Sequence, residues 1–166
     1  MAPSKPPRLK DFTYSGMHRY FVTICARDRV PVFRDAAIVE PVRMDLLRSS
    51  EICEFSVLAY CFMPDHVHVL LLAQSDLAPL LECVRLFKQV SAFGHRRRTG
   101  RVLWQTSFYE RVLRDDEETD AVARYVLENP VRAGMTRSVR DYQFCGSGVF
   151  TREQMESLWE EPSRRV

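Results

Sequence analysis

The sequence predicts an α+β fold of the ferredoxin-like or RRM-like class, in which helices pack on an antiparallel sheet. Segments rich in aromatic and β-branched residues alternate with amphipathic helical patterns in the order β-α-β-β-α-β. A tight turn joins two of the predicted strands, and one more helical pattern follows the last strand. With 166 residues, 46% hydrophobic and 28% charged, the chain has the size and composition of one globular domain.

The first part of the chain contains two predicted strands around one helix. Residues 20–25 and 55–62 are rich in aromatic and β-branched residues and are predicted to be strands. Asp35 is the expected N-cap of a helix that reaches about Arg48. Pro41 lies inside that helical pattern, so we expect it either to kink the helix or to mark its true start.

Residues 66–73 form the third predicted strand, and the tight turn Pro64-Asp65 joins it to the second strand in a hairpin. This strand opens with two histidines, His66 and His68, which are separated by one valine. Because a strand sends alternate side chains to opposite faces, both imidazoles would lie on one face, close enough to share a metal ion. Taken alone, such a pair is more often hydrogen-bonded than metal-bound.

A second long helix is expected after a cap at Ser75 or Asp76, with Pro79 in its first turn. An arginine-rich loop over residues 94–100 should follow it. Residues 103–113 then form the fourth predicted extended segment, which contains several aromatic side chains.

The net charge of +2 hides a strongly basic block. Between residues 85 and 114 there are eight basic residues and one acidic residue, so this segment carries a net charge of +7. Such a block favours a polyanion partner, although a solvated charged loop would explain the charge equally well. The candidate DNA-binding residues in the block are Lys88, Arg96, Arg97, Arg98, Arg101, Arg111 and Arg114.

The helical pattern after the basic block supplies the second half of the candidate site. Acidic residues 115–118 have the spacing of a capping box, and the helix should end near Glu128 because Pro130 disfavours helical geometry at the residue before it. Tyr125 and Asn129 are four residues apart and therefore share a helix face. If that helix face packs against the histidines, it would bring a candidate nucleophile, Tyr125, and a candidate metal ligand, Asn129, to the same site. By itself, the tyrosine is more typical of a core residue and the asparagine of a helix stop.

Cysteine usage and hydropathy limit the cellular setting. The five cysteines are scattered and odd in number, which indicates a reducing compartment, and we expect a cytoplasmic protein. The N-terminal residues lack the apolar core of a secretory signal, and the longest apolar run is too short to cross a membrane. We therefore expect no membrane partner.

Four groups of motif residues follow one another along the chain, at residues 63–70, 87–88, 104–105 with 109–115, and 124–134. In order and spacing they resemble the REP-associated tyrosine transposases, within the single-tyrosine HUH transposases of the insertion-sequence 200/605 type. The resemblance covers about residues 20–142. It implies a metal-dependent single-stranded DNA endonuclease and strand transferase that cleaves next to DNA hairpins.

Residue roles follow from this resemblance by position. His66 and His68 would be the ligands of Mg²⁺ or Mn²⁺, and Asn129 stands where relatives place a third polar metal-site residue, often Gln. Tyr125 would attack the scissile phosphate and hold a 5′-phosphotyrosine, releasing a 3′-hydroxyl. Relatives include monomers and homodimers, so it is open whether Tyr125 completes the site of its own chain or that of a partner.

The resemblance also suggests a division of the chain. Residues 1–16 would be a flexible basic tail, 17–143 the catalytic domain and 144–166 a C-terminal extension, in which 152–159 have a short helical pattern. The stretch 144–148 is richer in glycine than the Trp-Ser-Ser-like pattern of relatives.

Three other classes of protein could also carry some of these motifs. Two of them require residues that this chain lacks. A histidine-triad hydrolase requires a further histidine where Leu70 stands, and a two-histidine phosphoesterase requires a second His-x-Thr/Ser motif, which neither His18 nor His95 provides. The remaining rival is a non-cleaving, domesticated DNA- or RNA-binding protein on the same fold, which the basic block would serve equally well.

Overall fold

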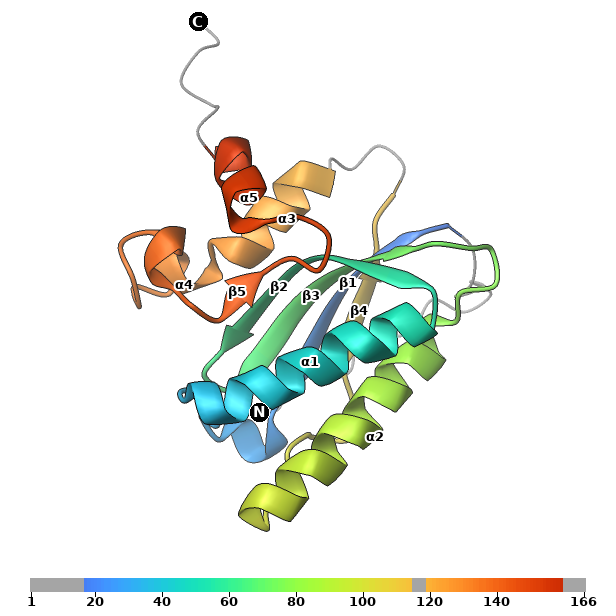
Figure 1. The fold of residues 1–166 in the computed structure, drawn as a ribbon, viewed down its shortest axis with the longest axis vertical. Coiled ribbons are helices and arrows are strands. Elements are labelled where there is room, and N and C mark those ends of the chain that lie inside the picture. Colours follow the sequence, from blue (N-terminus) through green and yellow to red (C-terminus); the bar gives the residue numbers. More distant parts are fainter. Residues whose placement is uncertain (1–16, 115–118, 160–166) are drawn as a thin grey trace, which may run out of the picture.

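The computed structural model describes residues 17–114 and 119–159, which form a five-stranded antiparallel sheet with helices on both faces (Figure 1). In space the strands run β4-β1-β3-β2-β5, and neighbouring strands are antiparallel. The first four strands have the predicted β-α-β-β-α-β order, so the expected fold class is confirmed. The strands are β1 (Arg19–Cys25), β2 (Phe55–Met63), β3 (His66–Ala73), β4 (Tyr109–Val112) and β5 (Cys145–Gly146).

The helices fall into two groups on the two sides of the sheet (Figure 1). The first two pack against each other over one face, and the third contacts β2 and β3 from the other face. Among the described residues, no helix is long and apolar enough to cross a membrane. The helices are α1 (Ala36–Ile52), α2 (Leu80–Thr99), α3 (Thr119–Leu127), α4 (Asn129–Arg132) and α5 (Arg152–Trp159), with short 3₁₀ turns η1 (Arg27–Arg29) and η2 (Val139–Asp141).

Strand alternation in β3 separates the core from the candidate site. Val67 and Val69 are 0% and 1% exposed and point into the core between the sheet and the first two helices. His66 and His68 therefore point to the opposite face, the one that α3 covers in part. The predicted hairpin of β2 and β3 is present, and it fixes both histidines on the rigid centre of the sheet.

The first helix begins as the sequence predicts and is longer than expected. Asp35 caps it, because its Oδ1 accepts a hydrogen bond from the backbone N–H of Ala37 at 2.9 Å. The helix runs through Pro41 and on to Ile52, so neither the predicted start at this proline nor the end near Arg48 is correct. Packing of its buried face against β2 and α2 outweighs the hydrogen bond that proline removes.

The boundaries predicted for the second helix are wrong at both ends. Ser75 accepts a hydrogen bond within a turn, and the helix starts only after Pro79. At the other end, the predicted arginine-rich loop is helical through Thr99. Arginine has high helix propensity, and its positive charge is favourable at a helix C-terminus, so the run extends the helix past Gly94. The helix ends at Gly100, which has the left-handed φ of 73° that a C-cap requires.

The fourth predicted extended segment is only partly a strand. β4 covers residues 109–112, and Trp104 makes one isolated bridge to Ala26. Between them, the Lys88 ammonium donates hydrogen bonds to the backbone carbonyls of residues 105–107 at 2.8–3.5 Å. These carbonyls face the lysine on α2, which accounts for the missing strand.

The C-terminal part agrees with some expectations and adds three short elements, α4, η2 and β5. The helix predicted over 152–159 is present, and α3 ends at Leu127, one residue before the predicted end. The chain then forms α4, with Pro130 in its first turn, where proline is tolerated. The predicted capping box over 115–118 and the predicted tail over 1–16 lie outside the described residues.

The start of the predicted C-terminal extension joins the sheet. Phe62 on β2 donates its backbone N–H to the carbonyl of Phe144 at 2.8 Å and accepts a hydrogen bond from the Tyr142 hydroxyl at 2.6 Å. β5 then pairs with the same strand. The predicted domain boundary at 143/144 stays a prediction, and the structure shows that residues on both sides of it pack on β2.

Gly146 allows the close approach of β5 to β2, and this generates a stability prediction. A Cβ at this position would lie 2.7 Å from the Tyr60 hydroxyl, a buried group. We expect Gly146→Ala to lower the free energy of unfolding by about 1–3 kcal/mol because the core must shift. Urea denaturation with linear extrapolation measures the change.

The matched control is Gly94→Ala within α2. There the added Cβ would meet only the end of the flexible Arg98 side chain, at 3.2 Å. Alanine should raise stability by about 0.5–1 kcal/mol through helix propensity. Equal stability of Gly146→Ala and the wild-type protein would contradict the packing argument.

Candidate metal and nucleophile site

The two predicted histidines meet through their outer ring nitrogens. His66 Nε2 and His68 Nε2 are 3.0 Å apart, and the ring centroids are 4.6 Å apart with nearly perpendicular planes. Without an ion, this contact is a hydrogen bond in which one Nε2–H donates to the other. With an ion, both lone pairs can point at it. Two ligands about 2.1 Å from one ion and at right angles would themselves be about 3.0 Å apart, so the pair fits a metal.

Each histidine is held by an oxygen on its inner ring nitrogen. His66 Nδ1 lies 2.6 Å from Asp65 Oδ1, and His68 Nδ1 lies 2.8 Å from Thr23 Oγ1. Arg29 in turn pairs with the second carboxylate oxygen of Asp65 at 2.8 Å. When Nδ1–H donates to its oxygen, Nε2 keeps its lone pair, which is the tautomer that a metal ligand needs.

Burial keeps both imidazoles neutral. Burial makes the largest contribution to the low pKa of His68, the neighbouring His66 and Arg29 add to it, and together they lower this pKa to about 3 although Asp65 opposes them. Burial also lowers the pKa of His66, although Asp65 opposes this effect. At neutral pH both rings are therefore uncharged, so each can offer the Nε2 lone pair to an ion when its single proton is on Nδ1.

The described residues offer no complete set of carboxylate, thiolate and imidazole ligands. Within residues 17–114 and 119–159, no group of three His, Cys, Asp or Glu side chains is placed to hold a metal ion. A third ligand from these residues would therefore be an amide or hydroxyl oxygen, and water or a phosphate oxygen would complete the set. Such a mixture of imidazole and oxygen donors suits Mn²⁺ and tolerates Mg²⁺.

Tyr125 lies beside this pair in the same chain. Its ring centroid is 6.5 Å from that of His68 and 5.9 Å from that of Phe21, which itself stacks on His68 at 5.4 Å. The residue is 39% exposed, so part of its surface is open to a substrate. The Arg132 guanidinium lies 4.5 Å above the tyrosine ring in a cation–π contact. The helix α3 therefore lies against the histidine face, which is the condition that the hypothesis of a joint site depends on.

Asn129 has a structural role at the end of α3, in agreement with the helix stop that the sequence predicts. Its Nδ2 donates to the carbonyls of Tyr125 at 2.7 Å and Val126 at 3.3 Å, which satisfies two carbonyl groups at the end of α3. The donating nitrogen faces the helix, and the amide oxygen remains as an acceptor. The metal-ligand role of Asn129 stays a prediction.

The predicted DNA-binding residues do not form one surface. The arginines of the α2 terminus lie in the helix layer that covers the other face of the sheet, away from the histidines (Figure 1). Arg111 is different, because it pairs in register with Phe21 and so belongs to the histidine face. Lys88 directs its ammonium at three backbone carbonyls, which makes it a structural residue whose contact with DNA stays a prediction. The α2-terminal group is Arg96, Arg97, Arg98 and Arg101, and Arg114 is exposed just after β4.

Sequence reasoning missed the residues that support the site. Asp65 lies in the predicted turn, and the pattern does not show that its carboxylate pairs with the next residue, His66. Arg132 lies seven residues after Tyr125, a helical spacing that could have identified it. No sequence pattern identifies Thr23, because only the register of β1 against β3 places it opposite His68.

A sheet-borne histidine pair beside a helix-borne tyrosine is the arrangement that the resemblance to the HUH-type tyrosine transposases implies, and it points to that class of DNA-acting enzyme. Comparison with known proteins leads to the same class. The profile of the family "Transposase IS200 like" matches residues 14–129, most of the chain. The chain therefore belongs to the IS200-like transposase family, and its resemblance to the REP-associated tyrosine transposases is confirmed.

Individual relatives agree with this assignment. The chain is 30% identical over 146 residues to a REP-associated tyrosine transposase of Haemophilus influenzae, with 81% of each chain covered. Its fold matches a solved REP-associated tyrosine transposase bound to a REP hairpin, with a TM-score of 0.68, 19% identity and coverage of 84% of this chain and 82% of that one. A Deinococcus radiodurans protein described as a transposase matches with a TM-score of 0.51, 22% identity and coverage of 75% and 97%.

The Thr23 contact generates a prediction about metal affinity. Thr23→Val keeps the shape of the side chain but removes the oxygen that holds His68 Nδ1. We expect the affinity for Mn²⁺ to fall by about 10–100-fold, as for other second-layer partners of metal-bound histidines. Titration of Mn²⁺ followed by electron paramagnetic resonance measures the change.

The control for this prediction is Thr106→Val, an exposed threonine outside the site. It should bind Mn²⁺ like the wild-type protein. If both variants bind the ion equally well, Thr23 does not position a metal ligand.

Proposed function

We propose that the protein is a metal-dependent single-stranded DNA endonuclease and strand transferase, in which Tyr125 forms a 5′-phosphotyrosine. The observation that carries this proposal is the position of the tyrosine ring, 6.5 Å from the ring of His68, on the face where the two histidine Nε2 atoms converge. Family membership supports the reaction class.

Each residue of the site has a distinct task in this proposal. His66 and His68 would hold Mg²⁺ or Mn²⁺, with Asn129 as a candidate oxygen ligand. Asp65 and Thr23 keep the imidazoles in the orientation and tautomer that binding requires. When bound, the ion would make the scissile phosphate more electrophilic and stabilise negative charge in the transition state.

The chain itself supplies the nucleophile and its orientation. Phe21 and Arg132 contact different parts of the Tyr125 ring and limit its rotation. The phenol oxygen forms a bond to phosphorus, and the bond from phosphorus to the 3′-oxygen breaks. The phenol loses its proton and the departing 3′-oxygen gains one. Attack by a 3′-hydroxyl on the phosphotyrosine reverses these changes and joins strands without an external energy source.

Hairpin DNA is the proposed substrate. One solved relative is bound to a REP hairpin, and the exposed arginines at the end of α2 together with Arg111 and Arg114 offer cationic contacts for the backbone of a folded DNA strand.

A single chain carries the histidines and the tyrosine of this site. We therefore propose that one copy is sufficient for strand cleavage, whether or not the protein forms a homodimer. The predicted cytoplasmic location stays a prediction.

The nucleophile is tested with a pair of tyrosine variants. Labelled hairpin DNA with a single-stranded flank is incubated with Mn²⁺, and adducts are detected on a denaturing gel. We expect a covalent protein–DNA adduct with the wild-type protein and none with Tyr125→Phe. Tyr109→Phe is the matched control, because Tyr109 is 38% exposed, contacts Phe21 and is equally accessible. It should form the adduct at the wild-type rate.

The outcomes separate the candidate functions. An adduct of equal yield in Tyr125→Phe would rule out this nucleophile. Absence of an adduct from the wild-type protein with every hairpin, despite tight hairpin binding, would favour the non-cleaving DNA- or RNA-binding protein. Chelation of the ion with EDTA should abolish the adduct and re-addition of Mn²⁺ should restore it.

The role of the α2 arginines is tested by salt dependence. In the triple variant Arg96→Ala, Arg97→Ala and Arg98→Ala, we expect weaker hairpin binding and a log–log salt slope that is smaller by about 2–3, since each neutralised phosphate contributes about 0.9. Binding is measured by fluorescence anisotropy at several salt concentrations. Arg85→Ala is the control, because its guanidinium already pairs with Glu82 at 2.7 Å. An unchanged slope in the triple variant would exclude these arginines from the interface.

A further inference from the structure

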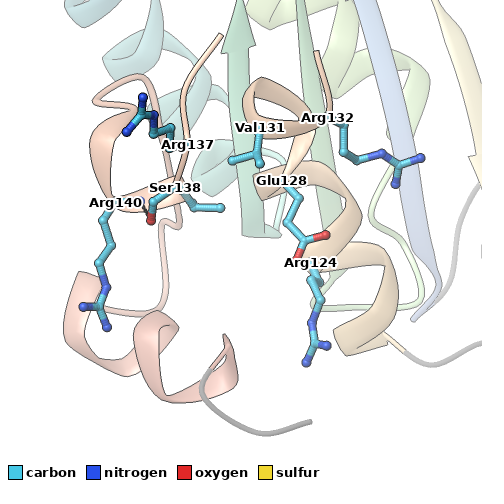
Figure 2. A pocket seen from close by; sticks show the side chains of 8 residues that line it. Arg124, Glu128, Val131, Arg132, Arg137, Ser138 and Arg140 are labelled. Carbon is cyan, nitrogen blue, oxygen red and sulfur yellow. Dashed lines mark hydrogen bonds between the residues drawn. The ribbon is translucent and has the colours of Figure 1, made fainter. Parts of the chain in front are cut away.

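A cavity of about 300 Å³ opens beside the proposed nucleophile, between α3 with α4 on one side and η2 on the other (Figure 2). Four arginines and one acidic residue line it. This lining leaves an excess of three positive charges around a volume at the lower end of the range for small-molecule sites. The charged lining residues are Arg124, Arg132, Arg137, Arg140 and Glu128.

The cavity is joined to Tyr125 by two of its arginines. Arg124 is the residue directly before Tyr125 on α3. Arg132 both lines the cavity and places its guanidinium 4.5 Å above the tyrosine ring. The Arg132 side chain extends away from Arg137 and Arg140 (Figure 2), so a strand attached to the tyrosine oxygen would reach the cavity by passing along Arg132.

The lining suits a nucleotide better than a bare anion. Guanidinium groups bind phosphate through paired hydrogen bonds. Val131 and Val139 add apolar wall against which a base can pack, and Glu128 offers an acceptor for an exocyclic amino group of a base. A carboxylate at this point would repel inorganic phosphate, whereas a nucleotide can use both kinds of contact.

The C-terminal segment helps to build this wall. Arg140 Nε lies 3.5 Å from a carboxylate oxygen of Glu156, and Arg152 donates a hydrogen bond to the Arg140 carbonyl at 2.7 Å. Ser138 caps η2 by accepting a hydrogen bond from the backbone N–H of Arg140. The side of the cavity formed by η2 is thus fixed to α5.

We propose that this cavity binds one nucleotide of the strand that Tyr125 retains, on the 3′ side of the scissile phosphate. The inference rests on the proposed function, because that function defines which strand stays attached. Cleavage releases the other strand with its 3′-hydroxyl, so a site for the retained strand keeps the 5′ end in place until it is joined again. Arg132 would link the two sites, since it contacts the tyrosine and lines the cavity.

The test uses binding without chemistry, in full-length protein that carries Tyr125→Phe. The probe is a fluorescein-labelled, 5′-phosphorylated tetradeoxycytidylate, followed by anisotropy. Two substitutions alter the cavity in different ways. Arg137→Ala removes an exposed charge, and Val131→Phe fills the space without changing the charge. Each should weaken binding by about fivefold or more, as expected for the loss of a charge-assisted contact or of the volume itself.

Two controls accompany the variants. Arg48→Ala removes an exposed charge from α1, in the helix layer that covers the other face of the sheet, and should bind the probe like the parent protein. Thermal unfolding of each variant identifies loss of fold, and Arg137→Ala at an exposed loop position keeps the test valid if Val131→Phe is unstable.

Competition with inorganic phosphate distinguishes a nucleotide site from an anion site. We expect millimolar phosphate to displace the probe far less effectively than unlabelled deoxycytidine 5′-monophosphate. Equal displacement by phosphate would overturn the nucleotide assignment, and unchanged probe binding in both cavity variants would overturn the site itself.

Failure of this inference can be told apart from failure of the proposed function. If the wild-type protein forms the Tyr125 adduct and the cavity variants bind the probe normally, the function stands and the cavity is not its strand site. If no adduct forms but the cavity variants lose the probe, the nucleotide site stands while the claim that it holds a retained strand is wrong.

Discussion

The site depends on the antiparallel register between β1 and β3. That register places Thr23 opposite His68, and the alternation of β3 turns both histidines away from the valines that fill the core. A shift by one residue would bury the imidazoles and expose Val67 and Val69. The hydrophobic core that stabilises the domain therefore also fixes the orientation of the candidate metal ligands, and the two cannot be altered independently.

Local patterns predicted the elements that are dominated by local physics. The alternation of His66 to Val69, the cap at Asp35 and the helical period of the last helix all depend on neighbours in the chain, and the structure has each of them. The error over residues 103–113 arose because a distant partner decides the structure there. Lys88 engages the carbonyls of residues 105–107 from another element, and the sequence contains no mark of that contact.

The candidate site shows the same division. The histidine pair and the spacing of Tyr125 and Asn129 were visible in the sequence, and the resemblance to a family gave them roles. The meeting of α3 with the histidine face depends on tertiary packing, which brings the tyrosine ring next to His68. The separation of the α2 arginines from the histidines was equally hidden, because their closeness in sequence to the site says nothing about which face of the sheet they occupy.

β5 is the shortest strand of the sheet and occupies a critical place. An exposed sheet edge offers unpaired backbone groups to any other extended chain. β5 pairs with Tyr60 and Cys61 on the outer edge of β2. The Phe144 carbonyl accepts a hydrogen bond from the backbone N–H of Phe62, the next residue of that strand. Another chain could add to β2 along this stretch only after the C-terminal segment had left. The C-terminal segment, which forms one wall of the arginine-lined cavity, thus also covers part of the β2 edge and blocks edge-to-edge association there.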